Sequence, residues 1–424
     1  MKVRLRRFTE HRVARNAGAL GLLQVVNYGA ALVVLVHLTR VLGVRTYGVV
    51  AFSIGITQVL SVVLDLGFAM SATERVAVHR ENRRFVGRLA GAVLLLKLAA
   101  FVVGALVVAA YASQTEKYAE YASLFMLSLL PLLGHALQPL WFFQGIERMR
   151  YVTIVTGAAR LAYVAGVMLL VRSEADFLWV PVADGIAQLG AAALGLYLLS
   201  GSGYRIARPR RREVRYAWGK TAGFLWSRMA ATLQTNSGIL LLGLAAAPAT
   251  VAVYSLAEQM YRALHSVFAP VTHALYPYMA KERKLGLLAR VTALCLGVAV
   301  VGAVAGHLLA PVVIPPYLGE EWRAALPVID VFLVAATVHV LVLMAGYPLA
   351  AALGRLDVAN RAVILATVLH LAFAALLLAL GAATPIAFAW VLVASESFLL
   401  VYSGVALVPI ARRQHVLGIV GQAR

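Results

Sequence analysis

Apolar runs of about twenty residues recur along the whole chain, each long enough to cross about 30 Å of hydrocarbon at 1.5 Å per helical residue. The 424 residues are 62% hydrophobic and only 13% charged, far from the composition of a water-soluble domain. A closed barrel of strands would alternate apolar and polar residues, whereas runs such as 105–110 and 376–380 do not alternate. The sequence therefore predicts an all-α integral membrane protein.

A hydropathy window of about nineteen residues predicts about twelve transmembrane helices, joined by connections too short to hold a soluble domain. The helices are expected near residues 17–38, 47–70, 88–112, 120–143, 151–171, 179–200, 220–243, 250–277, 286–310, 326–349, 360–381 and 385–410. The first apolar run lacks a small-residue cleavage site in the usual place, so we interpret it as a retained helix. The only cysteine, Cys295, lies inside an apolar run, and neither a disulfide nor a metal site is expected.

Lys and Arg residues gather in the loops on one side of the predicted helices. The loops of the opposite side hold only Arg40, Arg45, Lys117, Arg172 and Arg323. Since cations in short loops are retained in the cytoplasm, the bias predicts that both termini are cytoplasmic. The net charge of +20 then reflects topology and attraction to membrane lipids, and no nucleic-acid partner is expected.

A basic cluster at 208–212 falls between the sixth and seventh predicted helices. It suggests an amino-terminal six-helix lobe at 1–200, a basic cytoplasmic linker at 201–219 and a carboxyl-terminal six-helix lobe at 220–424. A short internal sequence repeat supports related halves, since Leu42-Gly43 and Leu242-Gly243 both precede the second predicted helix of their half.

Motifs of nucleotide binding and of enzymatic catalysis are absent. Gly219-Lys220-Thr221 resembles the end of a phosphate-binding loop, but Val214 stands where that loop needs a glycine. There is no paired-histidine zinc signature and no nucleophile elbow. The chain is therefore expected to be a transporter rather than an enzyme, driven by an ion gradient or by its substrate.

Ionisable side chains deep in a bilayer cost about 2.5 to 3.5 kcal/mol each on insertion scales, so they favour a protein interior or a wet cavity. The deepest here form a net cationic set: Lys97, Arg160, Arg228, Arg262, Glu258 and Glu396. Polar residues at helical spacing also mark the first two predicted helices of each half. These stripes are Gln24, Asn27 and Tyr28; Ser53, Thr57, Ser61 and Asp65; Arg228, Thr232, Thr235 and Asn236; and Tyr254, Glu258, Arg262 and His265.

Each of these groups also has a purely structural interpretation. Ser and Thr stripes often join helices, Glu258 and Arg262 can neutralise each other at i and i+4, and the stem of Lys97 can extend to the interface. His135, His307, His339 and His370 are expected to be packed or interfacial. Arg228 and Arg262 remain charged in any environment, and two deep guanidiniums favour an anion.

Several segments together resemble bacterial polysaccharide (O-antigen type) flippases of the multidrug/oligosaccharidyl-lipid/polysaccharide exporter superfamily. The most specific is Pro139-Leu140-Trp141-Phe142-Phe143-Gln144-Gly145. The others are Asn27, Arg40-Val41-Leu42-Gly43 with Tyr47-Gly48, Asp65-Leu66-Gly67-Phe68, and Val253-Tyr254-Ser255-Leu256-Ala257-Glu258-Gln259 through Tyr276-Pro277.

The resemblance implies two pseudo-symmetric six-helix lobes around a central cavity that opens alternately to either face. It also implies a substrate of undecaprenyl-pyrophosphate-linked oligosaccharide, turned to the outer leaflet for a surface polysaccharide. Arg228 and Arg262 are then candidates for binding the pyrophosphate. Candidates for contacting the sugar are Gln24, Asn27, Thr232, Gln234, Asn236 and Tyr254.

Glu258, Asp65 and Glu396 are the candidate residues for ion coupling, and a proton or a sodium ion is left open. No other cofactor is expected. The chain is expected to act as a monomer in the bacterial cytoplasmic membrane, and a polysaccharide polymerase or other assembly protein is a candidate partner. The alternative function is an ion-coupled small-molecule (multidrug-type) antiporter of the same fold. A glycan polymerase or ligase is disfavoured because the outer loop near 311–323 is short.

Overall fold

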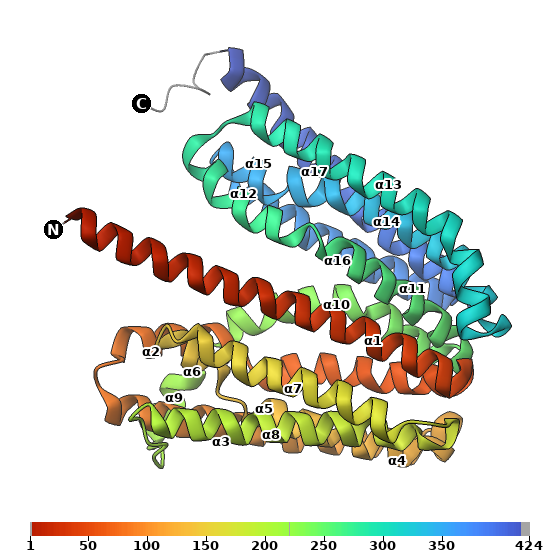
Figure 1. The fold of residues 1–424 in the computed structure, drawn as a ribbon, viewed down its shortest axis with the longest axis horizontal. Coiled ribbons are helices and arrows are strands. Elements are labelled where there is room, and N and C mark those ends of the chain that lie inside the picture. The colour runs from red at the N-terminus through yellow and green to blue at the C-terminus, as the bar shows by residue number, and fades with distance from the viewer. Residues whose placement is uncertain (1, 220, 417–424) are drawn as a thin grey trace. The chain divides into compact units, whose positions relative to one another are not determined.

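The computed structural model describes the backbone of residues 2–219 and 221–416 and, within them, the side chains outside 2–28, 222–224, 226–227, 230–231, 273 and 413–416. Every regular element in this described part is a helix (Figure 1). The all-α prediction is therefore confirmed. The chain divides into two compact units, residues 1–236 and 237–424.

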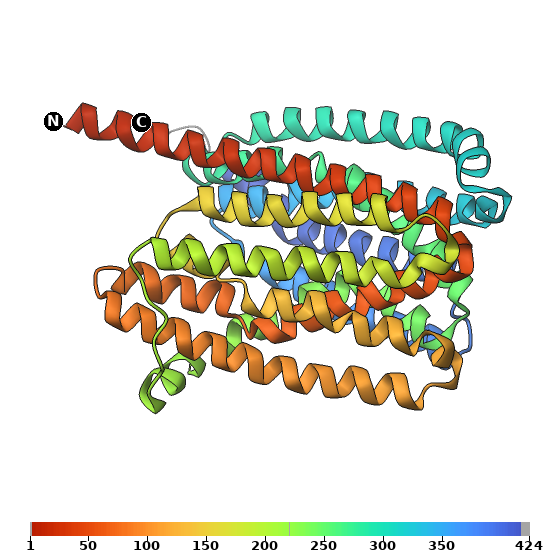
Figure 2. The ribbon, with the colours of Figure 1, turned by 60° about the horizontal axis from the view of Figure 1, so that its bottom comes forward.

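The first unit contains α1 to α9 and the beginning of α10, and Figure 2 shows its long helices running side by side. Within it α5 packs against α8, α8 against α7, and α7 against α1. The elements are α1 (Lys2–Asp65), α2 (Phe68–His79), α3 (Arg83–Gln114), η1 (Glu116–Tyr121), α4 (Ala122–Leu127), α5 (Leu129–Leu137), α6 (Leu140–Gly145), α7 (Met149–Leu170), η2 (Glu174–Leu178), α8 (Trp179–Gly201), α9 (Arg211–Trp218) and α10 (Thr221–Ala245).

Helix α1 covers both of the first two predicted helices. The chain bends at Gly43, and the backbone is helical on both sides of the bend. The backbone at Gly43 has φ 65° and ψ 172°, a region that glycine adopts without steric penalty. The predicted helix 120–143 is instead divided into η1, α4, α5 and α6. Its last break falls at Gln138, which is extended because Pro139 disfavours a helical conformation in the residue before it.

The motif 139–145 forms α6 and packs into the core of the first unit. Trp141, Phe142 and Phe143 are all buried there. A Cβ at Gly145 would lie 2.6 Å from the Cβ of Val76, so α6 can lie this close to α2 only with glycine at that position. The segment that is most specific in the sequence is thus a packing element.

The second unit contains the remainder of α10 and all later helices. Within it α14 packs against α17, α13 and α11, and α16 packs against α17. The elements are α11 (Pro248–Ser266), α12 (Ala269–Glu282), α13 (Leu285–Leu318), η3 (Glu320–Ala325), α14 (Leu326–Ala345), α15 (Tyr347–Ala352), α16 (Leu356–Ala379) and α17 (Pro385–Val416). The predicted helices 250–277 and 326–349 each correspond to two helices, α11 with α12 and α14 with α15.

Within the described residues, nine helical segments are long and apolar enough to cross a membrane. The first of them, Gly29–His79, covers two predicted helices. Helix α10 and the pair α11 and α12 correspond to the two predicted helices that remain, so the architecture of about twelve helices is confirmed. The cytoplasmic placement of the termini stays a prediction.

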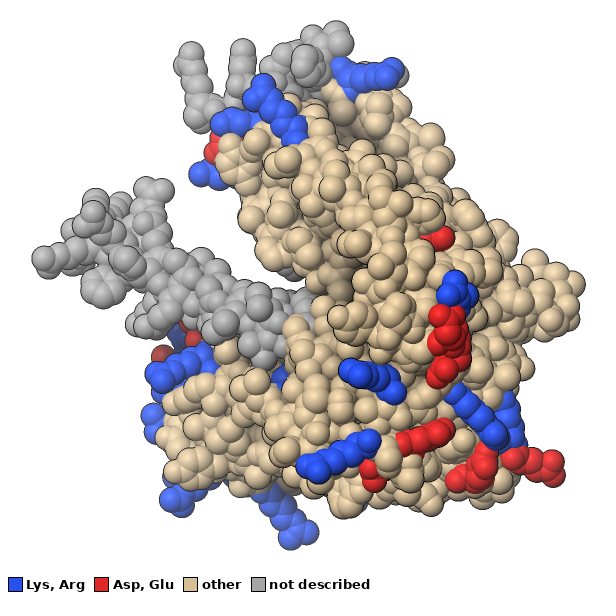
Figure 3. Space-filling model, turned by 45° about the vertical axis from the view of Figure 1, so that its right-hand side comes forward, with Lys and Arg blue, Asp and Glu red and all other residues tan. Residues whose placement is uncertain are grey.

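Apolar side chains cover much of the outer surface. On the face shown in Figure 3, uncharged residues make up most of the described area. On α3, Val103, Leu106 and Val107 are each more than half exposed. Such a surface is stable in lipid and not in water, because burying apolar area in hydrocarbon removes it from water.

Along the chain, the boundary between the two compact units falls within α10, between Asn236 and Ser237. The division predicted from the sequence follows the basic segment 201–219 instead. That segment includes α9 and belongs to the first unit. The predicted lobe boundaries stay a prediction about how the chain is organised in function.

Candidate functional site

A polar pocket of about 120 Å³ lies inside the first unit. Polar side chains from α1, α5, α7, α8 and the turn before α5 line it: Ser53, Thr57, Gln58, Ser61, Ser128, His135, Arg160, Tyr163, Asp184 and Gln188. The predicted stripe on the second part of α1 supplies three of them. Ser53 hydrogen-bonds Ser128, so this stripe both joins helices and lines the pocket.

A chain of amide and carboxylate groups closes one side of this pocket. Nε2 of Gln138 donates to Oε1 of Gln188 at 2.8 Å, and Nε2 of Gln188 donates to Oδ1 of Asp184 at 2.9 Å. Helices α5 and α8 lie close enough for these bonds because Gly134 and Gly185 have no side chain. A Cβ on either would lie 2.5 Å from an atom of the facing helix.

Lys97 pairs with Asp65 in the interior of the first unit. Its Nζ lies 3.4 Å from Oδ1 of Asp65, with 6% of the Lys97 side chain and 16% of the Asp65 side chain exposed. The same Nζ lies 3.5 Å from the carbonyl oxygen of His135. The side chain of Lys97 therefore does not extend to the interface. Asp65 also accepts the backbone N–H of Ala69, so it holds the turn between α1 and α2.

Arg228 lies half-buried on α10, within electrostatic range of Lys97. Among the described residues no carboxylate forms an ion pair with it, whereas Lys97 has Asp65. Of the other candidates on this helix, Asn236 is buried and its Nδ2 donates to the carbonyl oxygen of Thr232 at 3.0 Å. Gln234 is half-buried. The side chains of Gln24 and Asn27 lie outside the described residues.

The second unit contains a buried polar cluster on α11. Nη2 of Arg262 donates to Oε1 of Glu258 at 3.0 Å, and only 5% of the Glu258 side chain is exposed. The stripe read from the sequence thus includes an internal ion pair. Tyr254 is buried on the same helix, with its ring 5.3 Å from that of Phe332 and 6.5 Å from that of Phe388.

Glu396 of α17 and His339 of α14 form a second pair in this cluster. Oε1 of Glu396 lies 3.1 Å from Nδ1 of His339, and the two side chains are 8% and 18% exposed. The ring of His339 lies 4.9 Å from that of His265, which in turn lies 5.1 Å from that of Tyr261. Three titratable rings and a carboxylate from three helices are therefore contiguous.

His370 of α16 extends this cluster toward α10. Its Nε2 lies 2.8 Å from Oγ of Ser237 and its Nδ1 lies 3.2 Å from Oγ of Ser395. Ser395 is the neighbour of Glu396, which acts electrostatically on His370. Prediction placed His339 and His370 in packed or interfacial positions, and both are indeed packed, but each contacts polar partners.

Two carboxylate oxygens of the cluster are buried without a hydrogen-bond partner among the described residues: Oε2 of Glu258 and Oε2 of Glu396. A buried anionic oxygen is costly unless a donor, a proton or a cation satisfies it. The described side chains form no group of three His, Cys, Asp or Glu suited to a metal ion. Nδ1 of His339 is also buried without a hydrogen-bond partner there, so it and Glu396 are paired by distance and not by a formed hydrogen bond.

Asp184 and Gln188 were not among the residues selected from the sequence. Both lie on α8 and line the pocket of the first unit. The sequence did contain a sign of this polar face, since an acid and an amide four residues apart in an apolar helix lie on the same side. The partner of that face could not be read from the sequence because it lies on α5 and α7.

Comparison with known proteins identifies the family. Residues 13–282 match the family described as "Polysaccharide biosynthesis protein". The chain is 24% identical over 365 residues to the "Putative O-antigen transporter" of Shigella dysenteriae, which covers 85% of this chain and 91% of the relative. A protein of the same name from Escherichia coli strain K12 is 24% identical over 265 residues, 62% of this chain and 64% of the relative.

Solved structures share the fold. The lipid II flippase MurJ in an inward closed conformation superimposes with a TM-score of 0.73 at 11% identity, over 94% of this chain and 92% of the other. An inward-facing multidrug resistance MATE family transporter of the MOP superfamily gives 0.68 at 13% identity, over 92% and 96%. The predicted resemblance is confirmed, and these relatives are transporters and flippases rather than enzymes. The chain is a multi-pass membrane protein that belongs to the polysaccharide biosynthesis protein family, and it shares the fold of transporters of the multidrug/oligosaccharidyl-lipid/polysaccharide exporter superfamily.

Proposed function

We propose that this protein is a flippase, which moves an undecaprenyl-pyrophosphate-linked oligosaccharide from the cytoplasmic to the outer leaflet by alternating access, for export or assembly of a surface polysaccharide. The names of its relatives support a glycan substrate. A pyrophosphate and a sugar head cannot cross hydrocarbon alone, because each polar group without a partner costs about 2 to 7 kcal/mol. The protein must supply those partners while the lipid tail remains in the bilayer.

The observation that carries the proposal is the half-buried guanidinium of Arg228. Its charge is not balanced by a carboxylate among the described residues, whereas the charge of nearby Lys97 is balanced by Asp65. Arg262 shares its charge with Glu258. We therefore assign the main pyrophosphate contact to Arg228, by paired charge-assisted hydrogen bonds, and a secondary contact to Arg262. Thr232, Gln234 and Asn236 follow Arg228 on α10 as sugar contacts.

The ion that drives transport is proposed to be a proton held by Glu396 and His339. The other two candidate acids have partners that stay charged, Lys97 for Asp65 and Arg262 for Glu258. Glu396 is paired instead with histidine, the residue type that proteins commonly use to carry protons. The groups that face the pair are Tyr261 and His265 from α11 and His370 from α16, and Glu258 and Arg262 act electrostatically on Tyr261.

Deletion of the gene tests the proposed substrate. In a strain without a redundant flippase, the lipid-linked repeat unit should accumulate facing the cytoplasm, protected from a membrane-impermeant sugar-labelling reagent, and the surface glycan should disappear. The full chain supplied on a plasmid should restore both. Normal surface glycan in the deletion strain would overturn the proposal.

The alternative function is a small-molecule antiporter, because the fold is shared with a multidrug transporter. Growth of the same deletion strain in cationic dyes separates the two functions. Increased dye sensitivity with intact surface glycan would support the antiporter. Lost glycan with unchanged sensitivity would support the flippase.

A further inference from the structure

The segment 203–218 forms a strap, composed of an extended stretch and α9, that is fixed on helix α3. The backbone N–H of Ala207 donates to the carbonyl oxygen of Gly87 at 3.0 Å. A Cβ at Gly87 would lie 2.2 Å from the carbonyl oxygen of Arg205, and a Cβ at Gly91 would lie 2.2 Å from that of Ala207. The two glycines therefore allow the strap backbone to lie directly on the helix.

Further bonds hold the strap at both ends. Oη of Tyr204 donates to the carbonyl oxygen of Arg80 at 2.7 Å, and Nη1 of Arg75 donates to that of Ala217 at 2.8 Å. Within the strap, Glu213 accepts the backbone N–H of Arg210 at 2.9 Å and so stabilises the beginning of α9. Because it is anchored in this way, the strap presents its side chains in a fixed arrangement.

The charge of the strap is strongly one-sided. It contains six arginines and a single acid, Glu213, which is buried and also lies 3.7 Å from Arg88. The exposed guanidiniums of Arg208, Arg211 and Arg215 have no carboxylate partner among the described residues. They provide a place for an anion, since guanidinium groups bind phosphate oxygens by paired hydrogen bonds.

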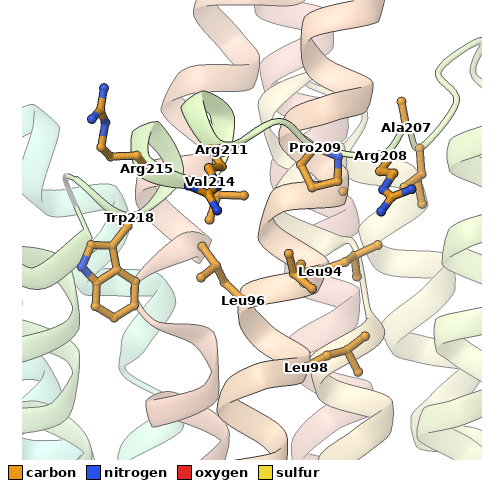
Figure 4. Close-up of a pocket in the computed structure, with 13 residues that line it drawn as sticks. Leu94, Leu96, Leu98, Ala207, Arg208, Pro209, Arg211, Val214, Arg215 and Trp218 are labelled. Carbon is orange, nitrogen blue, oxygen red and sulfur yellow. The ribbon is translucent and has the colours of Figure 1, made fainter.

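An open groove of about 940 Å³ lies between these arginines and α3. Figure 4 shows Leu94, Leu96 and Leu98 of α3 below the strap, with the indole of Trp218 on the same side. Leu95, also in the lining, is 52% exposed and Trp218 is 55% exposed. The groove thus has cationic groups at its rim and an aliphatic wall beneath them.

The position of the wall identifies the kind of ligand. Helix α3 crosses the membrane, and residues 94–98 lie one to two turns, about 5 to 10 Å, beyond the point where the strap touches Gly91. A soluble peptide would not reach a surface inside the hydrocarbon region. A phospholipid has both required parts, because its phosphate can meet the arginines while an acyl chain lies along the leucines. A tryptophan at this level is typical of the headgroup interface.

We infer that the groove beneath the strap is a binding site for one anionic glycerophospholipid of the leaflet that the strap faces. Arg208, Arg211 and Arg215 bind the phosphate, and Leu94, Leu95 and Leu98 contact the acyl chain. The site does not depend on which cargo the protein moves.

Native mass spectrometry of the full-length protein in detergent tests the site, with phosphatidylglycerol and phosphatidylcholine as probes. We expect the wild-type protein to retain one phosphatidylglycerol about tenfold more strongly than phosphatidylcholine, since each cation near a headgroup adds to the attraction. The triple variant R208Q/R211Q/R215Q should lose that preference. The matched control R150Q/R290Q/R412Q removes the same charge from exposed positions elsewhere and should keep it.

The variant Leu95→Gln leaves every arginine in place and tests the aliphatic wall. We expect retention of phosphatidylglycerol to fall severalfold, with the same elution volume in gel filtration as the wild type. Equal retention by the strap triple and the control triple would overturn the inference. Displacement of the lipid by inorganic pyrophosphate, or preferred strap-dependent binding of undecaprenyl phosphate, would also overturn it, because the site would then not be one for a glycerophospholipid.

Discussion

Oε1 of Glu396 lies 3.1 Å from Nδ1 of His339, and this pair joins α17 to α14 inside the second unit. Helix α14 also takes part in a contrasting, exposed pair, which joins its beginning to α13. Nδ1 of His307 lies 2.8 Å from Oδ1 of Asp330, with 63% and 45% of the side chains exposed. The exposed pair lies at the surface of the protein, whereas the buried pair is enclosed by helices, so we expect only the buried pair to couple a proton strongly to the conformation of the protein.

The variant Glu396→Gln should therefore abolish proton coupling, because an amide cannot exchange a proton with His339. We expect substrate-induced proton movement in reconstituted vesicles to fall at least about tenfold, which corresponds to 1.4 kcal/mol. Asp330→Asn is the matched control and should leave the signal unchanged. Proton movement in Glu396→Gln equal to that of the control would refute the assignment.

Arg228→Gln should reduce flipping of the lipid-linked glycan about tenfold to a hundredfold, because hydrogen bonds to charged groups contribute about 1.5 to 3 kcal/mol. The measurement is surface glycan per molecule of inserted protein in the complemented deletion strain. Arg290→Gln, at an exposed position of α13, serves as the control. Full activity in both variants would show that Arg228 does not bind the substrate.

Lys97→Met should destabilise the first unit, since it leaves the carboxylate of Asp65 mostly buried without its cation. Removing one partner of a buried pair costs about 3 to 5 kcal/mol. The apparent melting temperature in detergent should fall, and the double variant with Asp65→Asn should recover part of the loss. Lys281→Met, where the side chain is 82% exposed, should melt like the wild type. A double variant that melts no higher than Lys97→Met would argue against the pair as the cause.

Gly91→Ala should detach the strap from α3, because the new Cβ would lie 2.2 Å from the carbonyl oxygen of Ala207. Trypsin should then cleave the strap faster at its arginines. Gly190→Ala on α8 is the control, since no atom lies within 4 Å of its Cβ position and alanine favours a helix by about 1 kcal/mol. Equal cleavage rates in the two variants would mean that the contact does not hold the strap.

The helices were largely predictable because each contains a long, mostly apolar run, as in α3 and α16. The polar stripe containing Glu258 and Arg262 was also predictable, since residues four apart on a helix share a face. The break before α6 had a visible cause in Pro139. These features depend on neighbours in the sequence.

The partners of the buried groups were not predictable in the same way. Lys97 with Asp65, and His339 with Glu396, join helices that are distant in the sequence, and a single sequence holds no signal for such a pairing. Likewise, Gly87 and Gly91 look like ordinary helix-packing residues until Ala207 is found against them. The strap was therefore expected as a linker, and its groove was not expected at all.

The bend at Gly43 requires glycine because of the sign of its backbone torsion φ, and not because neighbouring atoms leave no room for a side chain. No atom lies within 4 Å of the position that a Cβ would occupy, so a methyl group there would meet nothing. Only the torsion φ of 65° excludes an ordinary side chain. A D-alanine introduced at this position by chemical synthesis should leave α1 bent, whereas its mirror image, identical in volume and polarity, should not.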